Sequence, residues 1–86
     1  MTNHTIMHET HLIEPIIKGI CRHAAEEGAK TVTKVHIKVG LLTGVKEESF
    51  KETFQLLAKG TMLEKAEINL TFFPGTIIQV LSFDVD

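Results

Sequence analysis

Cysteine is nearly absent from this sequence: Cys21 is the only thiol in 86 residues. A single thiol excludes an internal disulfide, and it excludes a cysteine-based zinc site because structural zinc takes about four ligands. No apolar run approaches the roughly 18 residues that span a bilayer. The first six residues have neither a basic start nor an apolar centre, so we expect no signal peptide and a cytoplasmic protein.

An excess of charge of one sign is also lacking, since the formal net charge is -2. This balance gives no basic footprint for nucleic acid and no basic face for a membrane surface. In the glycine-containing run Gly40–Gly44, the last glycine is not followed by the lysine and hydroxyl residue that end a phosphate loop. The run His8–His11 is one residue too short for a His-Glu-x-x-His zinc motif. We therefore expect no enzyme and no nucleic-acid or membrane partner.

Apolar residues at spacings of three and four predict a helix from about Glu9 to Glu27. Its apolar face comprises Leu12, Ile13, Ile16, Ile17, Ile20, Cys21, Ala24 and Ala25. On that face Cys21 is expected to be a buried, inert thiol. Pro15 leaves two possibilities open: the helix begins before it and bends there, or the regular helix begins at Pro15.

A second helix is predicted from about Glu47 to Lys59, and alternating apolar residues predict three strands. The second helix is expected to bury Phe50, Phe54 and Leu57. The strands are expected over residues 31–41, 66–72 and 77–85. Their inward-facing residues are expected to be Val35, Ile37, Val39 and Leu41, then Ala66, Ile68, Leu70 and Phe72, and finally Gln79, Leu81, Phe83 and Val85.

The order helix, strand, helix, strand, strand predicts an α+β fold with two layers. The first two strands should be parallel, and the Pro74-Gly75 turn should make the last two an antiparallel hairpin. The result is a three-stranded mixed sheet with two helices on one face, in a single domain of residues 1–86 with residues 1–6 as a loose extension. On the polar sheet face, Phe73, Ile78 and Val80 are either a patch for a partner or scattered apolar residues.

Histidine is concentrated at the front of the chain, where His4, His8 and His11 fall within eleven residues. Neutral imidazole is a good ligand for nickel. If the first helix extends back that far, His8 and His11 share one of its faces. His23 and His36 are expected to make only surface contacts.

The order of Met7-His8-Glu9 and the residues that follow it resembles the HypA family, the metallochaperones that deliver nickel to hydrogenase and sometimes urease. The other matching positions are Gly40, Val45, Glu48, Phe54, Gly60-Thr61 and Ala66. The resemblance implies that His8 is a nickel ligand, with the Met7 amine beside it and Glu9 in a supporting or partner-contact role. It also implies hydrogenase or other nickel-enzyme maturation proteins as partners. His11 and His4 are further candidate ligands.

Two features depart from that family. Six residues precede Met7, so it has a free amine only if translation starts there. Alternatively, removal of Met1 would leave Thr2-Asn3-His4, whose third-place imidazole suits a square-planar ion. Secondly, the family's zinc domain, with two Cys-x-x-Cys pairs, lies between the second and final strands. Here Phe73 leads directly into a short turn. We therefore expect no zinc site.

The sequence thus predicts a nickel-binding accessory protein that holds or delivers Ni(II) for a metalloenzyme, with His8 as the principal ligand. The alternative is a metal-free interaction module of the same fold, which pairs with itself or docks on a maturation partner.

Overall fold

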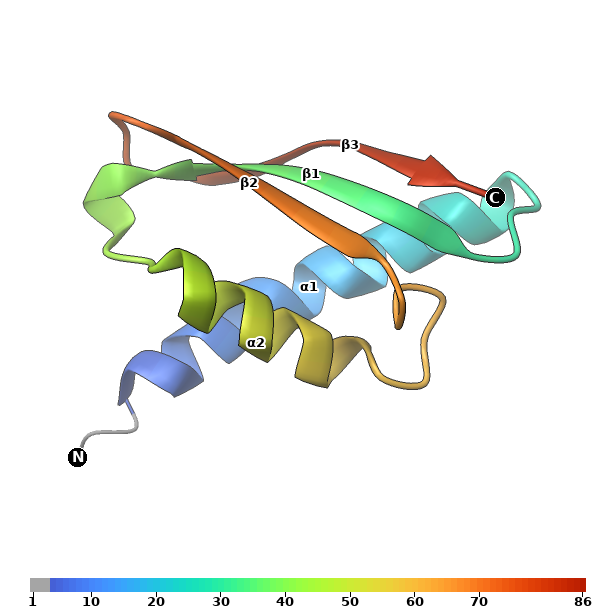
Figure 1. Ribbon diagram of the computed structural model, residues 1–86, viewed down its shortest axis with the longest axis horizontal. Coiled ribbons are helices and arrows are strands. Elements are labelled where there is room, and N and C mark those ends of the chain that lie inside the picture. Colours follow the sequence, from blue (N-terminus) through green and yellow to red (C-terminus); the bar gives the residue numbers. More distant parts are fainter. Residues whose placement is uncertain (1–3) are drawn as a thin grey trace.

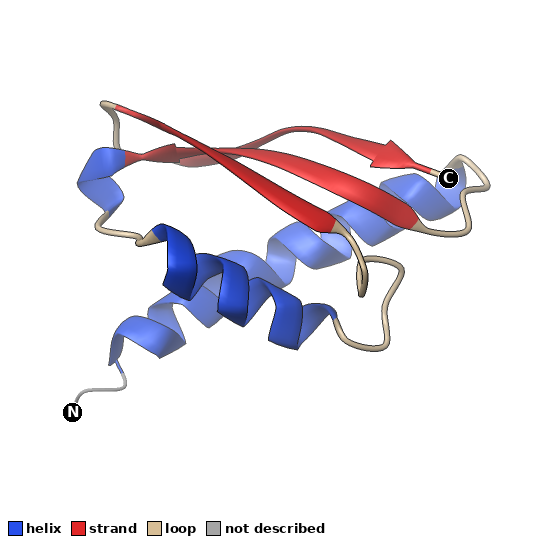
Figure 2. Cartoon of the chain, in the orientation of Figure 1, coloured by secondary structure: helices blue, strands red, loops and turns tan. Residues whose placement is uncertain are grey.

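A computed structural model describes the backbone of residues 4–86 and the side chains from residue 10 onward. The elements in order are α1 (His4–Glu26), β1 (Val32–Gly40), a 3-10 turn (Leu41–Thr43), α2 (Glu47–Ala58), β2 (Glu67–Phe73) and β3 (Ile78–Val85). Both helices lie on one side of the sheet (Figures 1 and 2). The predicted two-layer α+β fold and its element order are confirmed.

The strand order of the sheet is β2-β1-β3, so β1 is the central strand. It pairs in parallel with β2 and antiparallel with β3. The mixed sheet is as predicted, but the expected hairpin is wrong because β2 and β3 lie on opposite edges. The four residues 74–77 instead cross the end of β1 to reach the far edge.

Gly40, the last residue of β1, makes this crossing possible. A Cβ atom at this position would collide with the carbonyl oxygen of Gly75 and would lie 2.8 Å from the backbone nitrogen of Thr76. The Gly40 N–H donates to the Ile77 carbonyl at 2.8 Å, and the Leu42 N–H donates to the Gly75 carbonyl at 2.9 Å. The link therefore lies directly against the bare backbone of β1 and is hydrogen-bonded to it.

The hydrophobic core lies between the helices and the sheet, with residues from both helices and from β1 and β2. The largest fully buried side chains are Phe50, Phe54, Ile13, Ile37, Leu63, Val32, Val35 and Val39. The rings of Phe50 and Phe54 lie 6.2 Å apart between centroids. Ala58 is buried on α2, whereas Leu57 is only half-buried. Leu41, which we expected in the core, is 59% exposed because β1 ends before it.

A bulge in β3 changes which of its residues face the helices. Ile37 pairs with Val80 and the preceding His36 pairs with Ser82, so Leu81 is an extra residue between the two pairs. One extra residue reverses the alternation of side chains beyond it. On the two sides of the bulge, side chains of β3 therefore alternate between the two sheet faces in opposite order.

The apolar residues that pack against the core from β3 are Ile78, Val80 and Phe83. The expected inward set was right only for Phe83, since Gln79, Leu81 and Val85 are exposed. The expected patch on the polar face is likewise wrong for Ile78 and Val80. Phe73 does lie on that face, where the Lys38 ammonium sits 4.4 Å from its ring centroid.

Helix α1 begins earlier than the sequence predicted. The described part of the helix runs from His4, so residues 4–6 belong to it. Pro15 lies inside the helix, and the possibility that the regular helix begins at Pro15 is wrong. The apolar stripe of Ile13, Ile17, Ile20 and Ala24 is buried, as its spacing predicts.

Replacing Gly40 with alanine should lower the free energy of unfolding by about 2 kcal/mol or more, because the new methyl group collides with backbone atoms. Gly19→Ala is the matched control, since nothing lies within 4 Å of its added Cβ. The control should be neutral or up to about 1 kcal/mol stabilising. Urea denaturation measures both. A Gly40→Ala protein as stable as the original would contradict the crossing at this residue.

Replacing Phe50 with alanine should cost about 3–5 kcal/mol, since its fully buried ring leaves a cavity beside Phe54. Leu56 on the same helix is 64% exposed. Leu56→Ala should therefore change the free energy of unfolding by less than about 0.5 kcal/mol. Equal losses in the two variants would contradict the assigned face of α2.

Candidate metal site at the front of the first helix

The helical backbone of α1 determines how the three front histidines are arranged. They occupy positions 4, 8 and 11 of a helix that runs from His4 to Glu26. Residues four and three apart lie on the same helix face, with Cβ atoms about 5–6 Å apart between neighbours. The structure therefore places the three histidine positions on one face of α1. Of the three side chains only that of His11 is described, and it is exposed.

This histidine face lies opposite the face of α1 that packs on the core. At about 100° per residue, positions 4, 8 and 11 lie roughly half a turn away from the buried residues Ile13, Ile17, Ile20 and Ala24. A ligand held at these positions would lie on the side of α1 away from the core. The position of the face is thus compatible with taking up and releasing an ion.

Helix formation also affects the family's expected mode of binding, in which a terminal amine and backbone nitrogens join the imidazole. Within the described helix, the i→i−4 pattern gives the N–H of His8 the carbonyl of His4 as its partner. Coordination by that backbone nitrogen would require the first turn to unwind. Glu9 lies about 100° around the helix from His8. The side chains of Met7, His8, Glu9 and His4 lie outside the described part, and so does Thr2-Asn3.

The helix itself contributes two electrostatic features to this region. The N-terminus of a helix disfavours a cation by about 0.3–1 kcal/mol. Pro15 has no N–H, so it cannot donate to the carbonyl of His11 four residues earlier. That carbonyl adds negative partial charge on the same stretch of helix. The unfavourable term is small beside the binding energy of even a millimolar ligand, about 4 kcal/mol.

The other histidines lie elsewhere in the fold. His36 is on the open sheet face, with its Nε2 3.7 Å from Asp84 Oδ2. Its neighbour Lys34 pairs with Glu67 at 3.9 Å. His23 is exposed on α1. Over residues 10–86, where side chains are described, His, Cys, Asp and Glu form no group of three that could hold a metal.

Cys21 is a free thiol, and it is half-buried where we expected full burial. It packs beside the core from α1. Over residues 4–86, neither helix has the length and apolar character that crossing a bilayer requires.

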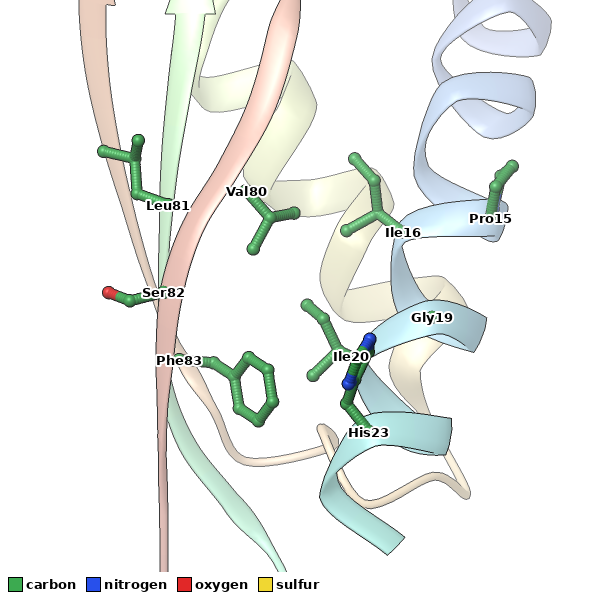
Figure 3. A pocket seen from close by; sticks show the side chains of 9 residues that line it. All are labelled: Pro15, Ile16, Gly19, Ile20, His23, Val80, Leu81, Ser82 and Phe83. Atoms are coloured by element: carbon green, nitrogen blue, oxygen red, sulfur yellow. The ribbon is translucent and has the colours of Figure 1, made fainter. Parts of the chain in front are cut away.

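An open groove between α1 and β3 was not foreseen from the sequence (Figure 3). Its volume is about 420 Å³, and it is lined by Pro15, Ile16, Gly19, Ile20, His23, Val80, Leu81, Ser82 and Phe83. Regular alternation along β3 predicted that Val80 lies on the polar face of the sheet. Val80 instead faces α1 and lines the groove, so the groove was not predicted. The uneven spacing of Ile78, Val80 and Phe83 was the available signal of a bulge.

Comparison with known protein families identifies the class to which this chain belongs. Residues 7–78 match the family described as "Hydrogenase/urease nickel incorporation, metallochaperone, hypA". This is a class of metal carriers, so the expectation that the chain is not an enzyme is confirmed. The chain belongs to the HypA family, as its sequence resemblance implied.

Curated relatives are named hydrogenase maturation factor HypA. The chain is 38% identical over 65 residues to the hydrogenase maturation factor HypA of Archaeoglobus fulgidus, covering 76% of this chain and 59% of that protein. It is 41% identical over 64 residues to the HypA of Francisella philomiragia, covering 74% and 56%. The match thus spans under two thirds of the length of these relatives.

Two solved structures share the fold. A solution structure described as HypA protein has a TM-score of 0.79 at 14% identity, covering 92% of this chain and 96% of the other. The solution structure of the nickel metallochaperone HypA from Helicobacter pylori has a TM-score of 0.75 at 12% identity, covering 90% and 96%. At this identity the likeness supports the fold alone.

Replacing Glu9 with glycine should lower the free energy of unfolding by about 0.5–1 kcal/mol relative to Glu9→Ala, because glycine is costly within a helix. Urea denaturation of both variants measures the difference. The pair Lys30→Gly and Lys30→Ala, in the loop after α1, is the control and should differ less. Identical stability of the two Glu9 variants would contradict a helix that begins at His4.

Proposed function

We propose that this chain holds Ni(II) with the imidazoles at the front of α1 and passes it to the maturation partners of a nickel enzyme. His8 is the principal ligand, and His4 and His11 flank it. Glu9 and Met7 have supporting roles, through partner contact and, where translation starts at residue 7, through a terminal amine. We also propose a cytoplasmic location.

The observation that carries this proposal is the continuous backbone of α1 from His4 onward. It brings positions 4, 8 and 11 within about 60° of one another around the helix, which supports ligation by more than one imidazole without a terminal amine. Imidazole is a good ligand for nickel. Membership of a nickel-incorporation family supports the identity of the metal.

Hydrogenase maturation proteins are the partners that the family description and the relatives' names support. A carrier has to release its ion, so a solvent-facing site of moderate affinity is better suited than a buried one. No zinc is required in this proposal. The metal-free interaction module remains the second candidate, and the groove between α1 and β3 is the observation that favours it.

Calorimetric titration of the 86-residue chain with Ni(II) should show binding tighter than about 1 mM. His8→Ala should weaken binding at least about tenfold, since it removes the central imidazole of the three. His36→Ala, on the sheet face, is the control and should bind as the original does. Affinity should fall at acid pH because protons compete for the imidazole nitrogens.

A second preparation that begins at Met7 separates the two modes of binding. If the terminal amine is an obligatory ligand, only that shorter chain binds nickel, and the helix-face site is wrong. If neither preparation binds more tightly than about 1 mM, the chain is not a nickel carrier. If His36→Ala weakens binding as much as His8→Ala, the site lies elsewhere.

A further inference from the structure

Helix α1 is interrupted at its midpoint by Pro15. This residue lies between two helical stretches, residues 4–14 and 16–26, and its side chain is exposed. It has no N–H to donate to the carbonyl of His11, and its ring crowds that carbonyl. Proline inside a helix is less favourable than any other residue. The hydrogen-bond ladder of α1 is therefore weakest between its two halves.

Gly19 weakens the helix a second time, one turn after Pro15. A Cβ atom at this position would meet nothing within 4 Å, and the backbone is helical, so neither crowding nor conformation requires glycine. Glycine inside a helix is destabilising relative to alanine. At about 100° per residue, Pro15 and Gly19 lie about 40° apart, on the side of α1 away from the buried stripe. We call residues 15–19 the soft segment.

The two halves of α1 are anchored to the core to different extents. Behind the soft segment, Ile20 and Ala24 are buried. In front of it, among the described side chains of residues 10–14, only Ile13 is buried. A helix shorter than about 12–15 residues is marginal in water, and residues 4–14 are fewer than that. The front half therefore depends on Ile13 and on a ladder that Pro15 interrupts.

Open space lies beside the soft segment. The groove of about 420 Å³ is lined on its α1 side by Pro15, Ile16, Gly19, Ile20 and His23. Val80 and Phe83 point toward α1 from the other side of the groove (Figure 3). A second opening of about 450 Å³ lies farther forward and is lined by Leu12 and Ile16 from α1. The surroundings of β3 thus leave room for the front of α1 to move.

We propose that the front of α1, residues 4–14, opens and re-forms as a unit at the soft segment while the rest of the fold stays intact, and that this opening releases the ion. The inference rests on the proposed function, in which positions 4, 8 and 11 hold nickel while the helix keeps them together. When the front unwinds, the imidazoles separate and the ion leaves. The frequency of opening then sets the rate of release. The affinity changes little, because the front is helical most of the time.

Native-state hydrogen exchange followed by NMR, with EDTA present, tests the opening without nickel. The amides of His11, Leu12 and Ile13 should exchange at one common rate, at least about 100-fold faster than those of Cys21 and Ala24. Low concentrations of urea should accelerate the front amides only weakly, because a local opening exposes little surface. The amides of Cys21 and Ala24 should respond steeply.

Pro15→Ala restores the missing hydrogen bond and should slow exchange of the front amides at least about tenfold. Gly19→Ala should act in the same direction, more weakly. The control, His23→Ala, raises helix propensity behind the soft segment and should leave the front amides unchanged. Rates that fall smoothly along α1, as fraying from its end gives, would overturn the proposal. Front amides with the urea dependence of Cys21 and Ala24 would also overturn it.

Transfer of nickel from the 86-residue chain to excess EDTA tests the link to release. Pro15→Ala should slow the transfer at least about threefold, with a dissociation constant within about twofold of the original, because opening becomes rarer. His23→Ala should transfer nickel at the original rate. Equal rates for Pro15→Ala and the original would overturn the proposal. If no preparation binds nickel, the proposed function fails, and hydrogen exchange still decides whether the front opens as a unit.

Discussion

The fold depends on β1 being paired on both sides while the chain still passes from one edge of the sheet to the other. The four-residue link between β2 and β3 has to cross the end of the central strand. Gly40 permits that crossing because it offers no side chain to the backbone of Gly75. A side chain at this position would push against the link that carries the chain to β3 and the groove beside α1.

Helix α1 carries both a buried apolar stripe and the histidine positions of the candidate metal site. Its buried stripe, Ile13 to Ala24, fixes the helix against the sheet. Positions 4, 8 and 11, which are histidines, fall on the opposite side of the helix. Gly19, which borders the groove, lies about 20° around the helix from position 8. The helix thus carries the buried stripe on one side, and the histidine positions and Gly19 on the other.

Much of this could be predicted from the sequence, because apolar spacing is a local signal. It indicated the two helices, the three strands and their order, and the core residues Phe50, Phe54, Val35, Ile37 and Val39. Apolar spacing did not predict three features. The first is the strand order, which depends on contacts far apart in the sequence, whereas a short link usually makes a hairpin. The bulge at Leu81 reverses a period-two pattern. Helix α1 extends to residues before Glu9, where the sequence shows no apolar stripe at helical spacing.

The candidate site followed from the sequence only as a set of residues: the histidines were visible, but their shared face required the helix to extend to His4. X-ray absorption at the nickel edge, on the 86-residue chain with one equivalent of Ni(II), tests this arrangement most directly. A helix-face site predicts five- or six-coordinate nickel with scattering from more than one imidazole. Four-coordinate planar nickel bound by amine and amide nitrogens, or nickel surrounded only by water, would contradict it.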